Sequence, residues 1–364
     1  MSKVRVIAFY LPQYHPTIDN DKWWGKGFTE WTNVGKARPL FPGHYQPRIP
    51  ADLGYYDLRL PEVREQQAKL AREAGIEGFC YYHYWFGNGK RELERPFDEV
   101  LTSGKPDFPF MLCWANESWH SKFWNKDGSV SKKLLVEQTY PGDEDIVAHF
   151  QFVLQAFKDK RYITIDEKPV FMIYQPDHYE EVSHFMDVWR NLAVRNGLPG
   201  IFFIASLLHD GSDERVNALK EMGFDAVNTV RLWDAFKKKV GAYKYIIMKI
   251  VRVLFGIPYL VRYKKIVAYM LTKVERRKDV FPTIVPNWDH SPRSGRSAMV
   301  LTGATPEVFG RHIDKVLSIV NEKPIERRLI FLKSWNEWGE GNYVEPDLRY
   351  GKQYIEVMQT KFGN

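Results

Sequence analysis

The sequence predicts an α/β fold in which one (β/α)8 TIM-type barrel uses the whole chain. Eight apolar runs of strand length alternate with helix-like segments along the 364 residues. The runs are nearly continuous in apolar residues, which is typical of parallel strands buried on both faces. Polar and aromatic residues follow strand after strand on the C-terminal side, where a closed barrel gathers its loops at one mouth.

The predicted strands are residues 4–11, 78–85, 110–114, 169–174, 201–207, 226–230, 283–285 and 329–333. The predicted helices between them are residues 61–74, 91–102, 143–158, 179–196 and 306–320. The helix at 61–74 begins with Pro61 and is followed by Gly75, which are the residues that favour a helix start and a helix stop.

Two segments stand out from this alternation. The connection after the first strand, residues 11–54, is unusually long and rich in Trp, Pro and Gly, and we expect it to fold over the barrel mouth. Residues 235–280, between the sixth and seventh strands, are predicted to form a basic amphipathic helical insertion. Since no internal repeat or low-complexity linker divides the chain, residues 1–364 are predicted to form a single domain.

The composition is that of a globular protein, with 44% hydrophobic and 27% charged residues, which excludes disordered and collagen-like classes. The 12 Trp, 20 Tyr and 23 Phe supply more flat amphipathic surface than a core usually needs. Many of these aromatic residues crowd at strand ends. Stacking on sugars or nucleobases is the function that this pattern indicates.

Cys80 and Cys113 lie inside predicted strands, so we interpret them as core thiols without a disulfide framework. The first residues lead directly into a strand, with no apolar signal-peptide region. No run reaches the roughly 18 apolar residues of a membrane-spanning helix. We therefore expect a cytoplasmic protein.

The formal charge of +7 is concentrated in one segment. Residues 237–278 hold 13 Lys or Arg and one acidic residue, Glu275. Ile246, Ile250 and Leu254 follow a helical period there, which favours a basic amphipathic helical hairpin on an anionic membrane surface, peripheral to the inner membrane. Solvated helices packed on the barrel are the alternative. Nucleic acid is not expected as a partner, because the basic block is local and its apolar residues are largely aliphatic.

The run 331–341 carries the strongest candidate for chemistry. A strand-like segment ends in Glu337 and Glu340, three residues apart, which can project into one pocket if the chain turns. Glycosyl transfer needs a proton donor at the departing oxygen and a base or nucleophile near the anomeric carbon, and two carboxyl groups supply both. A solvated pair on a surface turn is the alternative, which the flanking Trp335, Asn336 and Trp338 disfavour.

Further candidates for binding a sugar are aromatic and hydrogen-bonding residues at or beyond strand ends. They are Tyr10, His15, Trp31, Tyr82, His83, Trp85, Trp114, Asn116, Glu117, Trp119, Tyr174, Asn287, Trp288, Asp289, Trp335, Asn336 and Glu345. About half of residues 81–85 should point into the barrel, because side chains alternate along a strand, and core packing is the alternative for the rest. Asn116 could equally cap a helix or turn.

No metal or cofactor is predicted. His and Asp residues such as His83, Asp289 and His290 are scattered without the short ligand spacings of zinc sites. Two acidic triplets, residues 19–21 and 143–145, are similar to the DxD of nucleotide-sugar transferases, but the first lies in a loop and the second suits a helix start. Neither a GxGxxG nor a Walker loop is present.

A family resemblance rests on six segments that span most of the chain. They are residues 9–16, 24–34, 78–86, 114–117, 286–289 and 335–346, the last containing Trp335 to Gly341 and then Glu345-Pro346. Together they resemble glycoside hydrolase family 99, the endo-mannosidase family, and more closely its bacterial WbsX-like relatives, which are associated with surface polysaccharide biosynthesis.

The resemblance implies a (β/α)8 barrel and a retaining mechanism with participation of the sugar 2-hydroxyl. One Glu takes the proton of that hydroxyl, which closes on the anomeric carbon to give a 1,2-anhydro sugar, and the second protonates the leaving oxygen and then activates water. By position, the first role falls to Glu337 and the second to Glu340. The hydrolases carry His where this chain has Gly339, so the pocket near the acid differs.

The sequence therefore predicts a glycosidase or transglycosidase acting on a bacterial surface polysaccharide or its lipid-linked precursor. Two alternatives stay open. One is a glycosyltransferase of O-antigen or lipopolysaccharide biosynthesis that uses an activated donor. The other is a non-catalytic carbohydrate-binding barrel. The oligomeric state is not predicted.

Overall fold

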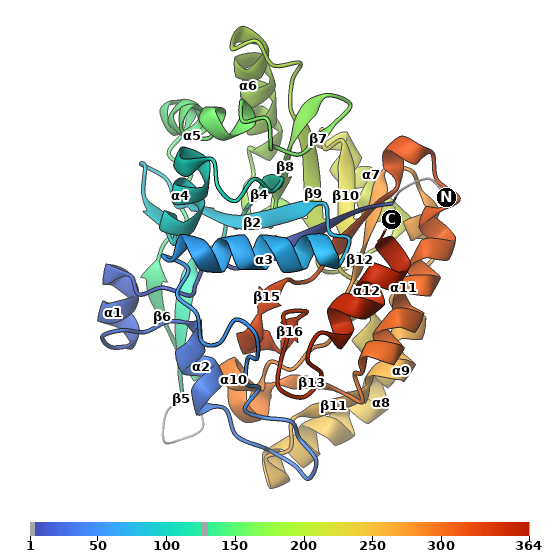
Figure 1. Cartoon of the computed structure of the whole chain (residues 1–364). Coiled ribbons are helices and arrows are strands. Elements are labelled where there is room, and N and C mark those ends of the chain that lie inside the picture. Colours follow the sequence, from blue (N-terminus) through green and yellow to red (C-terminus); the bar gives the residue numbers. More distant parts are fainter. Residues whose placement is uncertain (1–3, 125–129, 364) are drawn as a thin grey trace.

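The computed structural model of the chain describes residues 4–124 and 130–363, and this part contains a closed barrel of eight parallel strands (Figure 1). The barrel strands are β1 (Arg5–Tyr10), β2 (Gly78–Trp85), β4 (Phe110–Trp114), β8 (Lys168–Ile173), β9 (Phe202–Leu207), β10 (Ala226–Thr229), β12 (Val280–Ile284) and β14 (Leu329–Leu332). They pair in the order β1-β14-β12-β10-β9-β8-β4-β2, and β2 pairs back to β1. The predicted (β/α)8 barrel is confirmed.

The observed strands lie within one residue of the predicted bounds, except for the seventh. β12 begins at Val280, three residues before the predicted start, and contains Pro282. Proline cannot donate to a strand ladder and is uncommon inside strands. Here Asn228 of β10 supports the segment, because its Nδ2 donates to the carbonyl oxygen of Phe281 at 3.0 Å and to Thr283 Oγ1 at 2.8 Å.

Helices cover the outside of the barrel. They are α3 (Pro61–Glu73), α4 (Arg95–Ser103), α5 (Asp143–Phe157), α6 (Val182–Arg195), α7 (Asp213–Glu221), α8 (Leu232–Phe255), α11 (Pro306–Val320) and α12 (Gln353–Phe362). Of these, α7 and α12 were not predicted. The helix predicted at 91–102 starts later, because β3 (Arg91–Glu92) first pairs antiparallel with β2 and Pro96 lies in the first turn of α4.

Short elements build the loops of the barrel. Those at the C-terminal mouth are α1 (Ile18–Trp24), α2 (Glu30–Lys36), β5 (Trp119–Trp124), β6 (Val130–Val136), α10 (Ser291–Ser294), β13 (Met299–Thr302), β15 (Asn336–Glu337), β16 (Asn342–Tyr343) and the 3-10 turns Pro176–His178, Gly295–Ser297 and Trp338–Glu340. At the opposite end lie β7 (Thr164–Ile165) and the 3-10 turn Ile325–Arg327. As expected, the long first loop folds over the mouth, where α2 packs against α10 and against the turn Trp338–Glu340.

The basic insertion begins with α8, which is kinked at Gly241 (φ 67°) and ends at Gly256 in the left-handed conformation. The predicted helical hairpin is wrong in its second arm. After Gly256 the chain forms β11 (Tyr259–Arg262), which pairs with β13, and then α9 (Tyr263–Ile266) and the 3-10 turns Val267–Tyr269 and Val274–Arg276. Pro258 stops helical continuation, and the free edge of β13 offers hydrogen bonds instead. None of the helices in the described ranges is long and apolar enough to cross a membrane.

Candidate functional site

A cavity of about 490 Å³ opens at the C-terminal mouth of the barrel. Loops after several different strands contribute to it, as the barrel topology dictates. Its lining includes Gln13, Tyr82, Tyr84, Glu117, Trp119, Tyr174, His209, Trp233, Trp288, His290, Arg293, Lys333, Glu337 and Glu340. Aromatic faces and charged groups together suit a polar ligand with apolar ring faces, such as a sugar.

Both candidate carboxylates face this cavity from the segment after β14. Glu337 ends β15, whose antiparallel partner is β16, and Glu340 ends the 3-10 turn that follows. Ser334 Oγ accepts the backbone N–H of Glu337 at 3.0 Å. Gly341 adopts the left-handed conformation (φ 56°) that closes the turn. The chain thus turns tightly between the two Glu residues and directs both into one cavity.

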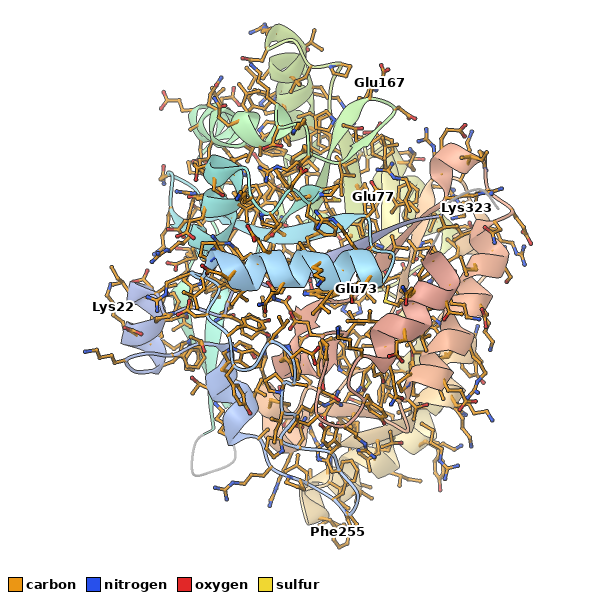
Figure 2. The ribbon with its side chains drawn as sticks, in the orientation of Figure 1. Lys22, Glu73, Glu77, Glu167, Phe255 and Lys323 are labelled. Carbon is orange, nitrogen blue, oxygen red and sulfur yellow. The ribbon has the colours of Figure 1, made fainter. Side chains whose placement is uncertain are left out.

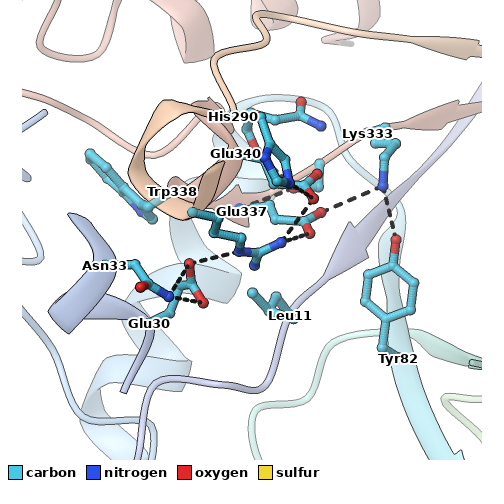
Figure 3. A network of polar contacts seen from close by, with 12 residues as sticks. Leu11, Glu30, Asn33, Tyr82, His290, Lys333, Glu337, Trp338 and Glu340 are labelled. Atoms are coloured by element: carbon cyan, nitrogen blue, oxygen red, sulfur yellow. Dashed lines mark hydrogen bonds and ion pairs between the residues drawn. The ribbon is translucent and has the colours of Figure 1, made fainter. Parts of the chain in front are cut away.

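A single guanidinium joins the carboxylates (Figure 3). Arg293 of α10 donates from Nη1 to Glu340 Oε1 at 2.8 Å and to Glu337 Oε1 at 3.3 Å. Its Nε donates to Glu30 Oε1 at 2.9 Å, and Glu30 is only 1% exposed on α2. A buried carboxylate therefore holds the arginine against the pair.

A second cation approaches Glu337 from the other side. Lys333 Nζ lies 3.5 Å from Glu337 Oε2 and donates to the Tyr82 hydroxyl at 3.1 Å. His290 Nε2 lies 3.4 Å from Glu340 Oε1. The two carboxyl groups thus have different neighbours, although they share Arg293.

These neighbours shift the pKa values of the two carboxyl groups in opposite directions. Burial raises the pKa of Glu337, and the charge of Glu340 raises it further, against Lys333 and Arg293. Burial also opposes ionisation of Glu340, but the Arg293 charge, then the hydrogen bond and charge of His290, outweigh it and hold the pKa of Glu340 well below its usual range. Of the two carboxyl groups, Glu337 is therefore the one that retains a proton more readily, and Glu340 is the one that ionises first.

Comparison with known proteins shows the family to which the chain belongs. The model of the family described as glycosyltransferase WbsX matches residues 6–358. The chain belongs to the WbsX glycosyltransferase family. Two relatives from strains of Xanthomonas campestris pv. campestris, both called "Uncharacterized protein WxcX", are 34% identical over 358 residues. That alignment covers 97% of this chain and 49% of each relative, so the chain spans about half the length of the curated relatives it matches.

Solved structures share the barrel of this WbsX-family chain. A "Glycoside hydrolase-like protein" has a TM-score of 0.60 at 16% identity, covering 100% of this chain and 95% of its own. The GH99 endo-alpha-mannosidase from Bacteroides thetaiotaomicron has a TM-score of 0.57 at 13% identity, covering 99% and 96%. At these identities the similarity shows the fold. The resemblance to WbsX-like proteins and to the family 99 barrel is confirmed.

The cavity of the WbsX-family barrel gathers part of the predicted binding set. Besides the two carboxylates, the predicted residues that line it are Tyr82, Glu117, Trp119, Tyr174 and Trp288. Burial raises the pKa of Glu117. Trp288 is 5% exposed, and its Nε1 has no hydrogen-bond partner within the described residues.

Other predicted residues point out of the barrel, which corrects their assignment to the site. Along β2, Tyr82 and Tyr84 line the cavity, whereas His83 and Trp85 face α5, as the alternation of side chains requires. His83 contacts His149 of α5 at 2.8 Å between the Nε2 atoms. On the same outer side, Trp114 packs against His149 and donates from Nε1 to the carbonyl oxygen of Trp85 at 2.9 Å.

Several predicted polar residues hold loops together beneath the site. Asn336 bonds both the N–H and the carbonyl of Leu11, at 2.8 and 3.0 Å. Asn116 does the same for Gln175, at 2.8 Å each way, so the capping alternative describes it better. Asp289 accepts from His44 and Gln46 at 2.8 and 2.7 Å and fixes the first long loop.

A buried cluster around Glu345 contains further predicted residues. Its carboxylate accepts from Trp338 Nε1 at 2.6 Å, Gln67 Nε2 at 2.7 Å and Tyr56 OH at 3.0 Å. Tyr10 bonds Gln67 at 2.7 Å and belongs to the same cluster. The remaining predicted residues also lie outside the cavity lining: His15, Trp31, Asn287 and Trp335.

Sequence reasoning missed Arg293, Lys333 and Glu30 as members of the site. Lys333 stands four residues before Glu337 in the motif itself, a spacing that could have drawn attention to it. Arg293 and Glu30 have no such signal, because they lie in loops after different strands and meet only once the barrel closes.

Proposed function

We propose that the chain is an enzyme that cleaves or transfers glycosidic bonds of a bacterial surface polysaccharide or its lipid-linked precursor, with Glu337 and Glu340 as acid and base. The observation that carries this proposal is the arrangement of two carboxyl groups, buried Glu337 and partly buried Glu340, in one sugar-sized cavity with their pKa values shifted in opposite directions. Such a separation is what lets one group donate a proton while the other accepts one. Family membership supports a glycan as the substrate.

The proposed reaction is the one that the resemblance to family 99 implies. A base takes the proton of the sugar 2-hydroxyl, the oxygen closes on the anomeric carbon, and the glycosidic bond breaks as an acid protonates the leaving oxygen. Water or a second hydroxyl then opens the 1,2-anhydro sugar, giving hydrolysis or transfer respectively.

The free site favours a division of roles opposite to the one implied by the resemblance. In the free site the pKa of Glu337 is raised and that of Glu340 is lowered. Glu337 would then donate the first proton and Glu340 accept it from the 2-hydroxyl. An aryl glycoside with a good leaving group distinguishes the two schemes, because it needs no acid. The Glu→Gln variant that retains turnover of this substrate identifies the acid.

A glycosyltransferase that uses a nucleotide-activated donor is the second candidate, which the family description favours. Calorimetric titration with nucleoside diphosphates tests it, since a transferase should bind the leaving nucleotide. For the proposed function, the purified chain is incubated with the host polysaccharide and with lipid-linked oligosaccharides. New reducing ends indicate hydrolysis, a change in chain length without them indicates transfer, and no change in either substrate contradicts the proposal.

The insertion supports a peripheral location at the cytoplasmic face of the inner membrane. Large apolar side chains are exposed along α8: Tyr243, Tyr245, Ile246, Ile247, Ile250, Val253, Leu254 and Phe255. Phe255 ends the helix and points away from the barrel (Figure 2). Glu275, the acidic residue of the basic segment, is 1% exposed and paired with Arg231 at 2.6 Å. The exposed charge of residues 237–278 is therefore positive, as an anionic lipid surface requires.

A further inference from the structure

A second cavity, of about 690 Å³, lies between the two arms of the kinked α8, β11 and the turn Gly295–Ser297. Its lining comprises Trp233, Phe236, Lys237, Val240, Gly241, Ala242, Tyr245, Lys249, Arg252, Tyr259 and Ser297. Trp233 and Ser297 also line the first cavity, so the two cavities are adjacent across a shared wall. A ligand in the second cavity would therefore lie next to the cavity that Glu337 and Glu340 line.

The charges of this cavity are all of one sign. Lys237, Lys249 and Arg252 line it, and none of its described lining residues carries a carboxylate. Within the described ranges, neither lysine forms an ion pair, while Arg252 lies over the ring of Tyr259 at 5.0 Å. Three cations without a protein counter-charge around one apolar cavity favour an anionic ligand.

The rest of the wall is aromatic and aliphatic. Tyr245 stacks on Tyr259 with ring centroids 5.5 Å apart, and Phe236 meets Tyr259 edge-on at 6.0 Å. Gly241 lines the cavity at the kink of α8, where its positive φ is accessible to glycine at little cost. The bend wraps the helix around the cavity and brings cations from both of its arms to one place.

We propose that the second cavity binds the diphosphate of an amphiphilic, prenyl-linked glycan, whose sugar reaches the first cavity. The proposal rests on the proposed function and adds to it a binding site for the carrier. Lys237, Lys249 and Arg252 would pair with the phosphate oxygens, as Lys and Arg commonly do. The apolar wall continues into the exposed face of α8 at Ile246, Ile250 and Val253, which suits a hydrocarbon chain leaving the site toward a membrane.

A nucleoside diphosphate has the same charged group and could stack its base on Tyr245 or Tyr259. The unpartnered apolar face beside the cavity favours the prenyl source, because a nucleotide would leave that face unused. Soluble probes separate the two sources: farnesyl diphosphate, uridine diphosphate, inorganic pyrophosphate and farnesol.

The test is calorimetric binding of these probes to the full chain, with farnesyl diphosphate kept below its micelle concentration. We expect saturable binding of farnesyl diphosphate, tighter than that of pyrophosphate or farnesol. The double variant Lys237→Ala/Lys249→Ala should weaken it about tenfold or more, as the loss of two charge-assisted contacts implies. Lys244→Ala is the matched control, since Lys244 is exposed on the same helix but does not line the cavity.

The outcomes are distinct. Absence of saturable farnesyl diphosphate binding, or equal weakening by Lys244→Ala, overturns the proposal. Tighter binding of uridine diphosphate that depends on Lys237 and Lys249 supports a diphosphate site but overturns the prenyl source. Binding of farnesyl diphosphate to Glu337→Gln should equal that of the unmodified chain. The carrier site and the carboxylate chemistry can thus fail independently.

Discussion

The carboxylate of Glu30 occupies the space that any side chain at position 339 would need. A Cβ built on Gly339 would lie 1.6 Å from Glu30 Oε1 and 3.0 Å from Arg293 Nε. Glycine is required here for close approach rather than for backbone freedom. Gly339, where the resemblance to family 99 implies His, thus lets Glu30 lie close to the turn and hold Arg293 against Glu337 and Glu340.

Gly339→Ala should therefore displace Glu30 and release Arg293. We expect kcat/KM on the glycan substrate to fall about tenfold or more, because small displacements of positioning groups are costly. The matched control is Gly35→Ala, since Gly35 lies in α2, the helix that carries Glu30, and has open space around its Cβ. Equal activity of the two variants would contradict the role of Gly339.

Arg293→Met should change the pH dependence of the reaction. Arg293 lowers the pKa of Glu340, so its removal raises that pKa, and the ionised form is then lost at a higher pH on acidification. The acidic limb of the kcat/KM profile should move up by about one to three pH units, the range for loss of a close opposite charge. Arg293→Lys keeps the charge and should shift the limb less. An unmoved limb in Arg293→Met would refute the electrostatic role.

Trp288→Phe should weaken substrate binding while leaving the fold stable. Trp288 lines the cavity, so the change removes part of the indole surface that a bound sugar would contact. We expect KM to rise about two- to tenfold, which corresponds to the loss of about 0.5–1.5 kcal/mol of binding free energy.

Trp189→Phe should have the opposite effects, with reduced stability and an unchanged KM. Trp189 is fully buried, and its Nε1 donates to the carbonyl oxygen of Ile146 at 3.0 Å, outside the site. This variant should lose about 1–3 kcal/mol of unfolding free energy and keep its KM, because a buried acceptor is left unpaired. If both Trp variants alter KM equally, the assignment of Trp288 is wrong.

Glu345 should make part of the stability depend on pH. Burial raises its pKa from 4.5 to about 7 in the folded chain, against the hydrogen bonds from Trp338, Gln67 and Tyr56. A raised folded-state pKa favours folding below about pH 4.5, and this contribution is lost as the pH rises through about 7. Glu345→Gln should therefore reduce the decrease in Tm between pH 5 and pH 8. An unchanged slope would contradict this account.

Val253→Glu should reduce cosedimentation with anionic vesicles several-fold, because a carboxylate opposes both burial in lipid and the negative surface. Cosedimentation of the unmodified chain should also decline at high salt. Val194→Glu is the control, since Val194 is 63% exposed on α6 and Val253 is 71% exposed on α8. Equal recovery in neutral vesicles, or no recovery in anionic ones, would count against membrane contact.

The barrel and its carboxylate pair could be predicted because both leave local signals in the sequence. Apolar runs mark the strands, and the motif at 331–341 follows the last strand directly. Alternation along β2 also predicts that half of its aromatic residues face inward. Which alternate residues of β2 face inward could not be predicted, because His83 and Tyr84 look equally suited to a site. Only the pairing of β2 with β1 and β4 decides that Tyr84 points inward.

What could not be predicted depends on contacts between distant segments. Asn336 and Asp289 carry polar side chains typical of a sugar site, yet their partners lie 325 and 245 residues away in the first loop. Arg293 meets Glu30 across 263 residues. Similarly, a helix was predicted where the structure has the strand β11. This strand pairs with the edge of β13, and no local sequence pattern indicates that pairing.

The most direct test of the account is single-turnover and steady-state kinetics of Glu337→Gln and Glu340→Gln on the host glycan that the unmodified chain turns over, with thermal unfolding measured in parallel. We predict that each variant loses about 10²–10⁴-fold in kcat, the usual contribution of a positioned acid or base, while Tm stays near that of the unmodified chain. Turnover within threefold of the unmodified chain in either variant would contradict the central claim.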